Sequence, residues 1–142
     1  MGKLTKGKPI VNDSAYRALA EFRYHIRRYL QFSDQNAKAA GMEPKQYQLL
    51  LAIKGLAKDK QASVGVLAEQ LHIRHHRTVE LINRAEANGL VQRKRMGNYV
   101  VVRLTPTGER VLARAVHRRL KELRGAAPKL VKALQKLIAA RE

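Results

Sequence analysis

A short polar segment near the middle of the chain carries side chains that could contact nucleic-acid bases. Arg74 and Arg77 are of the type that binds guanine edges through paired hydrogen bonds. His75, His76 and Thr78 could reach bases or phosphates, and Arg84 is placed to meet a phosphate. The segment is therefore a candidate DNA contact surface made of Arg74, His75, His76, Arg77, Thr78, Glu80 and Arg84.

A second basic group follows closely along the chain. Arg93, Lys94 and Arg95 are consecutive in a segment with strand character. Strand alternation places Arg93 and Arg95 on one face and Lys94 on the other. We expect these three side chains to hold phosphates.

The elements around these residues follow a recognisable order. A short apolar helix ends at Leu71, the turn His72–Arg74 has Ile73 as its buried residue, and a second helix runs from about His75 to Asn88. Two β-rich runs, residues 90–95 and 99–104, then meet at Gly97-Asn98 in a predicted hairpin. This order predicts a winged helix-turn-helix, in which the second helix enters the major groove and the hairpin is the wing.

Amphipathic helices are predicted on both sides of this unit. An apolar stripe from Leu19 to Leu30 indicates a helix over residues 15–40, capped by Asp13 or Ser14, and Pro44 begins the next helix. Thr105-Pro106 begins another, which we expect to break at Gly125–Pro128 before a last helix. The prediction is a mainly α fold with one small β-hairpin, in the order α-α-α-α-β-β-α-α.

Three segments, in this order, resemble the MarR family of bacterial winged helix-turn-helix transcriptional regulators. They are Val66–Leu71, Leu81–Val91 and Arg103–Gly108, which look like the family patterns "LA..L", "LVDRLE..GLV" and "V.LT..G". The resemblance covers roughly residues 14–142. It implies an obligate homodimer held by the terminal helices, and repression at palindromic promoter sites. It also implies relief by a small, commonly phenolic ligand, for which Tyr16, Tyr24 and Tyr47 are candidate pocket residues.

The sequence departs from the usual features of the family in two respects. The resemblance also sets the expected domain boundaries. Family wings usually carry an Asp-x-Arg near the tip, whereas this short wing has only Arg95–Tyr99 there, which favours phosphate contacts over minor-groove insertion. The chain has no cysteine, so its own residues cannot form a thiol redox switch. We expect a flexible basic arm at 1–12 and a single domain at 13–142, with the winged helix at about 44–104 and dimerisation helices at about 14–40 and 106–141.

Composition narrows the classes of protein further. The chain has 142 residues and a formal net charge of +18, with 45% hydrophobic residues, which is enough for one domain with a core. It has no phosphate-binding loop, no His-Glu-x-x-His and no apolar run longer than Leu49–Ile53. His72 and His76 are four apart, but a turn separates them and no nearby carboxylate completes a metal site. We expect no enzyme activity, cofactor or metal, no membrane partner, and a cytoplasmic, nucleoid-associated location.

The charge distribution leaves other functions open. Residues 61–104 carry a net charge of only +4, whereas residues 1–60 and 105–142 carry +7 each. A sequence-tolerant architectural protein that binds double-stranded DNA is therefore an alternative to a sequence-specific regulator. A module that binds an acidic protein through its basic helices is a third.

Overall fold

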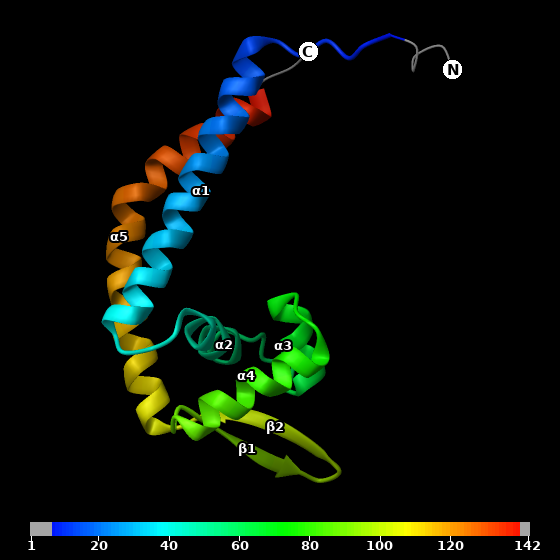
Figure 1. Ribbon diagram of the computed structural model, residues 1–142, viewed down its shortest axis with the longest axis vertical. Helices are drawn as coiled ribbons and strands as arrows, with labels where there is room; N and C mark the ends of the chain where they lie inside the picture. Colours follow the sequence, from blue (N-terminus) through cyan, green and yellow to red (C-terminus); the bar gives the residue numbers. More distant parts are fainter. Residues whose placement is uncertain (1–6, 140–142) are drawn as a thin grey trace. The chain divides into compact units, whose positions relative to one another are not determined.

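The computed structural model describes residues 7–139, and Figure 1 shows the arrangement of the elements within its parts. The described elements are α1 (Asp13–Ala39), α2 (Pro44–Lys54), α3 (Val64–Leu71), α4 (His75–Ala87), β1 (Val91–Met96), β2 (Tyr99–Leu104) and α5 (Pro106–Ala139). The predicted fold class is confirmed, and the element bounds differ from the predicted ones by a few residues, except that α5 replaces the two predicted C-terminal helices. None of the described helices is long and apolar enough to cross a membrane.

The chain forms two compact units. The first, the terminal unit, comprises residues 1–32 and 121–142, and the second, the winged-helix unit, comprises residues 33–120. Both α1 and α5 contribute residues to each unit. In the predicted basic arm, residues 7–12 are exposed and without helix or strand, while Lys3 and Lys6 lie outside the described residues.

An aliphatic core holds the winged-helix unit together. Leu49 and Leu50 of α2, Leu67 of α3 and Ile82 of α4 are fully buried, and Val102 of β2 packs in the same cluster. Burying a leucine or isoleucine contributes about 1.5–3 kcal/mol, so these few side chains supply much of the stability of the unit. The core therefore fixes α4 against α2, α3 and the hairpin.

The turn between α3 and α4 has the predicted position. The Ser63 hydroxyl accepts a hydrogen bond from the backbone N–H of Val66 at 3.2 Å and caps the start of α3. His72 ends α3 in the left-handed conformation, with φ of 54°. Ile73 is only half-buried but packs against the core, so its predicted role as the apolar residue of the turn is largely confirmed.

The hairpin is antiparallel and has the predicted turn. Met96 pairs with Tyr99 and Val91 pairs with Leu104, which leaves Gly97 and Asn98 as the two turn residues. Gly97 has φ of 65°, a conformation that a two-residue hairpin turn requires and that glycine adopts without strain.

The base of the hairpin is joined to the end of α4 and the start of α5. Thr105 donates its hydroxyl hydrogen to the carbonyl of Gly89 at 2.6 Å and accepts from the N–H of Gly108 at 3.0 Å. A Cβ atom on Gly108 would lie 2.0 Å from the carbonyl oxygen of Leu90, so only glycine fits there. The hydrogen bonds of Thr105 and the close packing of Gly108 thus explain these two residues of the Arg103–Gly108 motif within the winged-helix unit.

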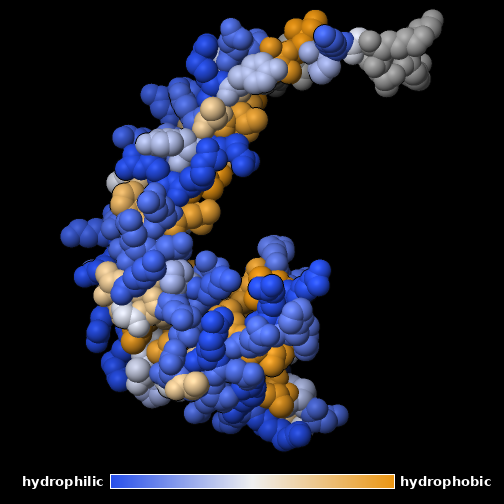
Figure 2. All heavy atoms as spheres, viewed as in Figure 1, coloured by the Kyte–Doolittle hydropathy of each residue, from blue (hydrophilic) through white to orange (hydrophobic). Residues whose placement is uncertain are grey.

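The terminal unit pairs the first part of α1 with the last part of α5. Lys136 and Glu21 form an ion pair at 3.5 Å between the two helices. Ala18 and Ala133 are buried, while Leu19, Val131 and Leu134 are exposed. Figure 2 shows hydrophobic residues on the surface along these helices.

Two details of the terminal helices differ from the predictions. The first turn of α1 is capped by the side chain of Asn12, which accepts from the N–H of Ala15 at 2.9 Å, and not by Asp13 or Ser14. The predicted break at Gly125–Pro128 is wrong, because α5 continues to Ala139 with Pro128 inside it. The covered positions Leu123, Ala127, Leu130, Ala133 and Leu137 follow steps of three and four, and only an unbroken helix keeps them on one side.

Candidate nucleic-acid interface

The outward face of α4 gathers most of the predicted base-contacting residues. Leu81, Ile82 and Ala85 are buried and fix the inward face of the helix. The exposed residues on the opposite face recur at steps of three and four, which places them side by side along the helix. They are His76, Arg77, Glu80 and Arg84.

The first turn of α4 presents further donors. Arg74 is the N-cap residue and makes no side-chain cap hydrogen bond, and His75 follows it in an exposed position. Backbone N–H groups in the first turn of a helix have no partner within the helix and favour anions. Arg74, His75 and these N–H groups therefore lie together at the N-terminal end of α4.

Thr78 lies in the core and not on the contact surface. Its side chain is completely buried, and its hydroxyl donates a hydrogen bond to the carbonyl of Arg74 at 3.0 Å. A side chain in this position cannot reach a base without unfolding the helix end. The predicted contact by Thr78 is therefore corrected to a structural role.

The wing cations have two different environments. Lys94 and Arg95 are exposed along β1, as a phosphate contact requires. Arg93 is half-buried, because its side chain turns toward α4. The three neighbouring cations are thus not equivalent, although the sequence presents them as one group.

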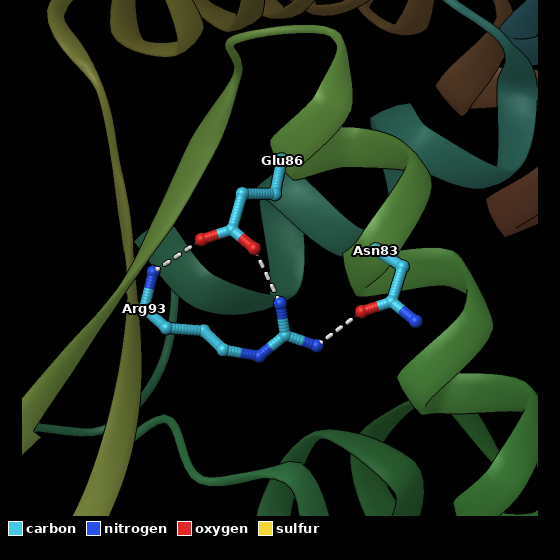
Figure 3. A network of polar contacts seen from close by, with 3 residues as sticks. All are labelled: Asn83, Glu86 and Arg93. Carbon is cyan, nitrogen blue, oxygen red and sulfur yellow. Dashed lines mark hydrogen bonds and ion pairs between the residues drawn. The ribbon is translucent and has the colours of Figure 1, made fainter.

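Arg93 binds two side chains of α4, as Figure 3 shows. One carboxylate oxygen of Glu86 accepts the backbone N–H of Arg93 at 3.0 Å, and the other accepts the Nη1 hydrogen at 2.5 Å. The Nη2 group donates to Oδ1 of Asn83 at 2.5 Å. We call Asn83, Glu86 and Arg93 the Arg93 network. Sequence reasoning missed Asn83 and Glu86, although their spacing of three placed them on one side of the predicted helix.

The same network lowers the pKa of Glu86. The backbone hydrogen bond from Arg93 is the largest cause of the lowering, and desolvation, which comes next, opposes it. The charge and the side-chain hydrogen bond of Arg93 lower the pKa further. The ionised form of Glu86 is therefore favoured below its ordinary pKa, and the network remains charged at neutral pH.

The three candidate pocket tyrosines have different surroundings. Tyr16 and Tyr24 of the terminal unit are exposed, whereas Tyr47 of the winged-helix unit is buried in the core. Within the winged-helix unit, an open hollow of about 320 Å³ lies beside the wing, and Tyr47 does not line it. Its lining includes Leu56, Lys58, Lys60, Met96, Val101 and Arg103.

The histidines of the α3–α4 turn do not belong to a group of metal-ligating side chains in the described part of the chain. Within residues 7–139, no three histidine, aspartate or glutamate side chains are grouped as a metal ion would require. His75 and His76 are both exposed at the start of α4 and available for contacts with a phosphate or a base.

A family model supports the resemblance found in the sequence. Residues 40–97, from the end of α1 to the turn of the wing, match the model of the MarR family. This segment is similar to the MarR family. No curated protein sequence matches the MarR-like chain.

Solved structures show the same fold over more of the chain. A MarR family protein from Bacillus stearothermophilus is 25% identical, with 80% of each chain covered and a TM-score of 0.70. AbsC, a MarR family transcriptional regulator from Streptomyces coelicolor, is 16% identical, with 84% of this chain and 82% of that chain covered and a TM-score of 0.70. A mutant of MepR from Staphylococcus aureus bound to an oligodeoxyribonucleotide is 16% identical, with 84% and 88% covered and a TM-score of 0.62.

Proposed function

We propose that the MarR-like chain is a sequence-specific transcriptional regulator that binds double-stranded DNA as a homodimer. The observation that carries this proposal is the exposed face of α4, where His76, Arg77, Glu80 and Arg84 project from a helix held by a buried core. A rigid helix with adjacent donors and acceptors suits readout of base edges in the major groove. The MarR family match supports the same role.

A homodimer would present two such helices to one DNA site. The exposed Leu19, Val131, Leu134 and Ile138 of the terminal unit support this assembly, because a second copy would remove them from water. Two reading helices about 34 Å apart would bind a palindromic site through successive major grooves. We infer repression by occlusion of a promoter in the cytoplasm of a bacterium, and no enzymatic role.

Selection of bound fragments from a random duplex library tests the proposal. We expect enrichment of an inverted repeat. Replacing Arg77 with alanine should weaken binding to the enriched duplex by about 1–3 kcal/mol and relax the preference at one base step. Arg110→Ala is the matched control, because it removes the same charge from an exposed position at the start of α5.

The architectural alternative gives a different result. Its supporting observation is that 14 of the 18 excess charges lie outside residues 61–104. A sequence-tolerant binder would enrich no repeat, and Arg77→Ala and Arg110→Ala would weaken all duplexes to a similar extent. That outcome would reject sequence-specific regulation.

We further propose that a small phenolic or aromatic effector weakens DNA binding, as the family resemblance implies. An effector needs a coupling of only about 1–3 kcal/mol to change DNA affinity by roughly 5–150-fold. A panel of phenols and aromatic acids should contain compounds that raise the melting temperature and release the enriched duplex. A panel without such compounds would contradict the proposal of a phenolic or aromatic effector.

A further inference from the structure

We propose that Arg93 is a positioning residue that fixes the wing against the reading helix, and that the phosphate contacts of the wing belong to Lys94 and Arg95. This inference rests on the proposed DNA-binding function and changes the role that the sequence suggested for Arg93. The geometry that carries it is the contact of Arg93 with both Glu86 and Asn83 of α4.

The hydrogen bonds at the two edges of the hairpin show what the Arg93 network does. Arg93 pairs with Val102 across the hairpin. The N–H of Val102 donates to the carbonyl of Ala62 at 2.9 Å, and the N–H of Arg93 donates to Glu86 at 3.0 Å. In an antiparallel pair of this kind both N–H groups point away from the partner strand. The hairpin is therefore attached on one edge to the segment before α3 and on the other edge to α4.

These two attachments lie at the same level of the hairpin. Beyond this level, toward the turn, Lys94, Arg95, Val100 and Tyr99 are exposed or carry only the opposite strand as backbone partner. An isolated two-stranded hairpin is only marginally stable in water. Val101, which pairs with Lys94, is buried and holds one face of the hairpin. The hydrogen bonds of Arg93 and Val102 hold its two edges, so together these contacts set the direction in which Lys94 and Arg95 project.

The charge balance at Arg93 also argues against a phosphate contact. Its side chain is 30% exposed, and Glu86 compensates its charge at 2.5 Å. A phosphate would have to displace the carboxylate or share the guanidinium with it. Lys94 and Arg95 are exposed, and no carboxylate contact is described for either of them. Their full charge is available to DNA, where each phosphate contact adds about 0.9 to the salt dependence of binding.

The chemistry of the network requires arginine. The guanidinium group binds Glu86 and Asn83 at the same time through two nitrogen atoms in a fixed plane. A lysine keeps the charge but has one nitrogen on a flexible stem, so it cannot reproduce this fork. Arg93→Lys therefore separates positioning from charge, and Arg95→Lys is its matched control on the same strand face.

The first experiment needs no DNA. Amide hydrogen exchange of residues 91–104 should be about tenfold faster in Arg93→Lys than in the wild type, because local opening of the wing becomes easier. Arg95→Lys should exchange at the wild-type rate. An unchanged melting temperature and circular dichroism spectrum would show that both variants are folded. Wild-type exchange in Arg93→Lys would overturn the proposal.

The second experiment measures affinity for the duplex enriched from the random library as a function of salt. Arg93→Lys should lose about 3- to 30-fold in affinity, a loss that falls within the range of coupling between neighbouring residues, and its salt slope should be unchanged. Lys94→Gln should reduce the slope by about 0.9. A reduced slope in Arg93→Gln, equal to that of Lys94→Gln, would identify Arg93 as a phosphate contact and overturn the proposal.

Replacing Glu86 tests the proposal through the direction in which the affinity for DNA changes. Removing a negative charge near DNA should strengthen binding by simple Coulomb attraction, whereas loss of wing positioning should weaken it. We expect Glu86→Ala to bind more weakly and to show faster wing exchange, and Glu86→Gln to be intermediate because it keeps an acceptor oxygen for the Arg93 N–H. Stronger binding by Glu86→Ala would contradict the proposal. If the wild type enriches no duplex, the proposed function fails, and the exchange experiment still decides whether Arg93 holds the wing.

Discussion

The two units of the chain bury their apolar residues to different extents. In the winged-helix unit, Leu49, Leu50, Leu67 and Ile82 are completely covered. In the described part of the terminal unit only Ala18 and Ala133 are buried, while several leucine, valine and isoleucine side chains are exposed. The winged-helix unit has a core of its own, whereas the terminal unit has an apolar surface that a second copy could cover.

Charge distinguishes the two units in a different way. Each carries a net charge of +9, but the terminal unit has 54 residues and the winged-helix unit has 88. Two terminal units brought together would repel each other, and the apolar surface must outweigh this repulsion. The stability of a single chain therefore depends on the winged-helix core, and the proposed homodimer would depend on the exposed apolar residues of the terminal helices.

The largest expected difference between the units concerns two glycines of α5. Gly108→Ala should reduce the free energy of unfolding by about 3 kcal/mol or more, because the new methyl group would lie 2.0 Å from the Leu90 carbonyl oxygen. Gly125→Ala in the terminal unit meets no neighbouring atom and should stabilise the helix by about 0.5–1 kcal/mol. Urea unfolding at one fixed protein concentration measures both. Equal effects would contradict the close packing at Leu90.

The second prediction compares two leucines of nearly equal exposure. Leu134 of the terminal unit is 41% exposed, and Leu51 of the winged-helix unit is 42% exposed. Leu134→Gln should weaken the dimer by about 3 kcal/mol, which is roughly 1.5 kcal/mol for each copy and about 150-fold in the dissociation constant. Leu51→Gln should leave it nearly unchanged. Sedimentation equilibrium tests this, and a monomeric wild type at micromolar concentration would reject the role of the terminal unit.

Helix caps provide a smaller test of the same difference. Ser63→Ala removes the cap of α3 inside the winged-helix unit and should cost about 1 kcal/mol of unfolding free energy. Asn12→Ala removes the cap of α1, but the exposed start of that helix can fray without opening the core. We expect a global loss below about 0.5 kcal/mol there. A larger loss from Asn12→Ala would show that the terminal unit is as cooperative as the winged-helix unit.

The smallest expected effect is an acid dependence confined to the wing. The pKa of Glu86 is lowered below its ordinary value of 4.5, so the stabilisation by the Arg93 network is complete above that value and is lost as the pH falls through the lowered pKa. The carboxyl carbon shift of Glu86 in an NMR titration should have a midpoint below 4.5. Arg93→Lys keeps the backbone N–H and the charge, so its midpoint should rise only slightly, whereas Arg93→Gln, which also removes the charge, should raise the midpoint further. An unmoved midpoint in Arg93→Gln would show that the Arg93 side chain does not contribute.

Much of the fold could be predicted because local signals agree with the packing. Pro44, Thr105-Pro106 and Gly97-Asn98 mark helix starts and a hairpin turn through backbone geometry alone, and the structure confirms each position. The break at Pro128 could not be predicted correctly by this reasoning. Proline disfavours a helix interior, but the apolar stripe from Leu123 to Leu137 outweighs that cost.

In the candidate site, too, the positions of some side chains could be predicted from the sequence and those of others could not. Arg77, Glu80 and Arg84 are exposed on α4 as the helical spacing predicts, although their contacts with DNA remain predictions. Thr78 has the type of a contact residue, yet the rotation of α4 against α2 and α3 places it in the core. Arg77 and Thr78 are adjacent, so a rotation of α4 by one residue would exchange the exposed position for the buried one. The packing of Leu81 and Ile82 in the core sets the rotation of the helix.

The sequence by itself determined the order of the elements, the positions of the turns and the excess of positive charge, since these depend on residue type and on neighbours along the chain. Only the tertiary structure decided that Arg93 faces Glu86 and Asn83 while Lys94 and Arg95 face solvent. The physical reason is that a hairpin and a helix adjoin through contacts between residues seven and ten positions apart, and no local propensity specifies which side chains meet there.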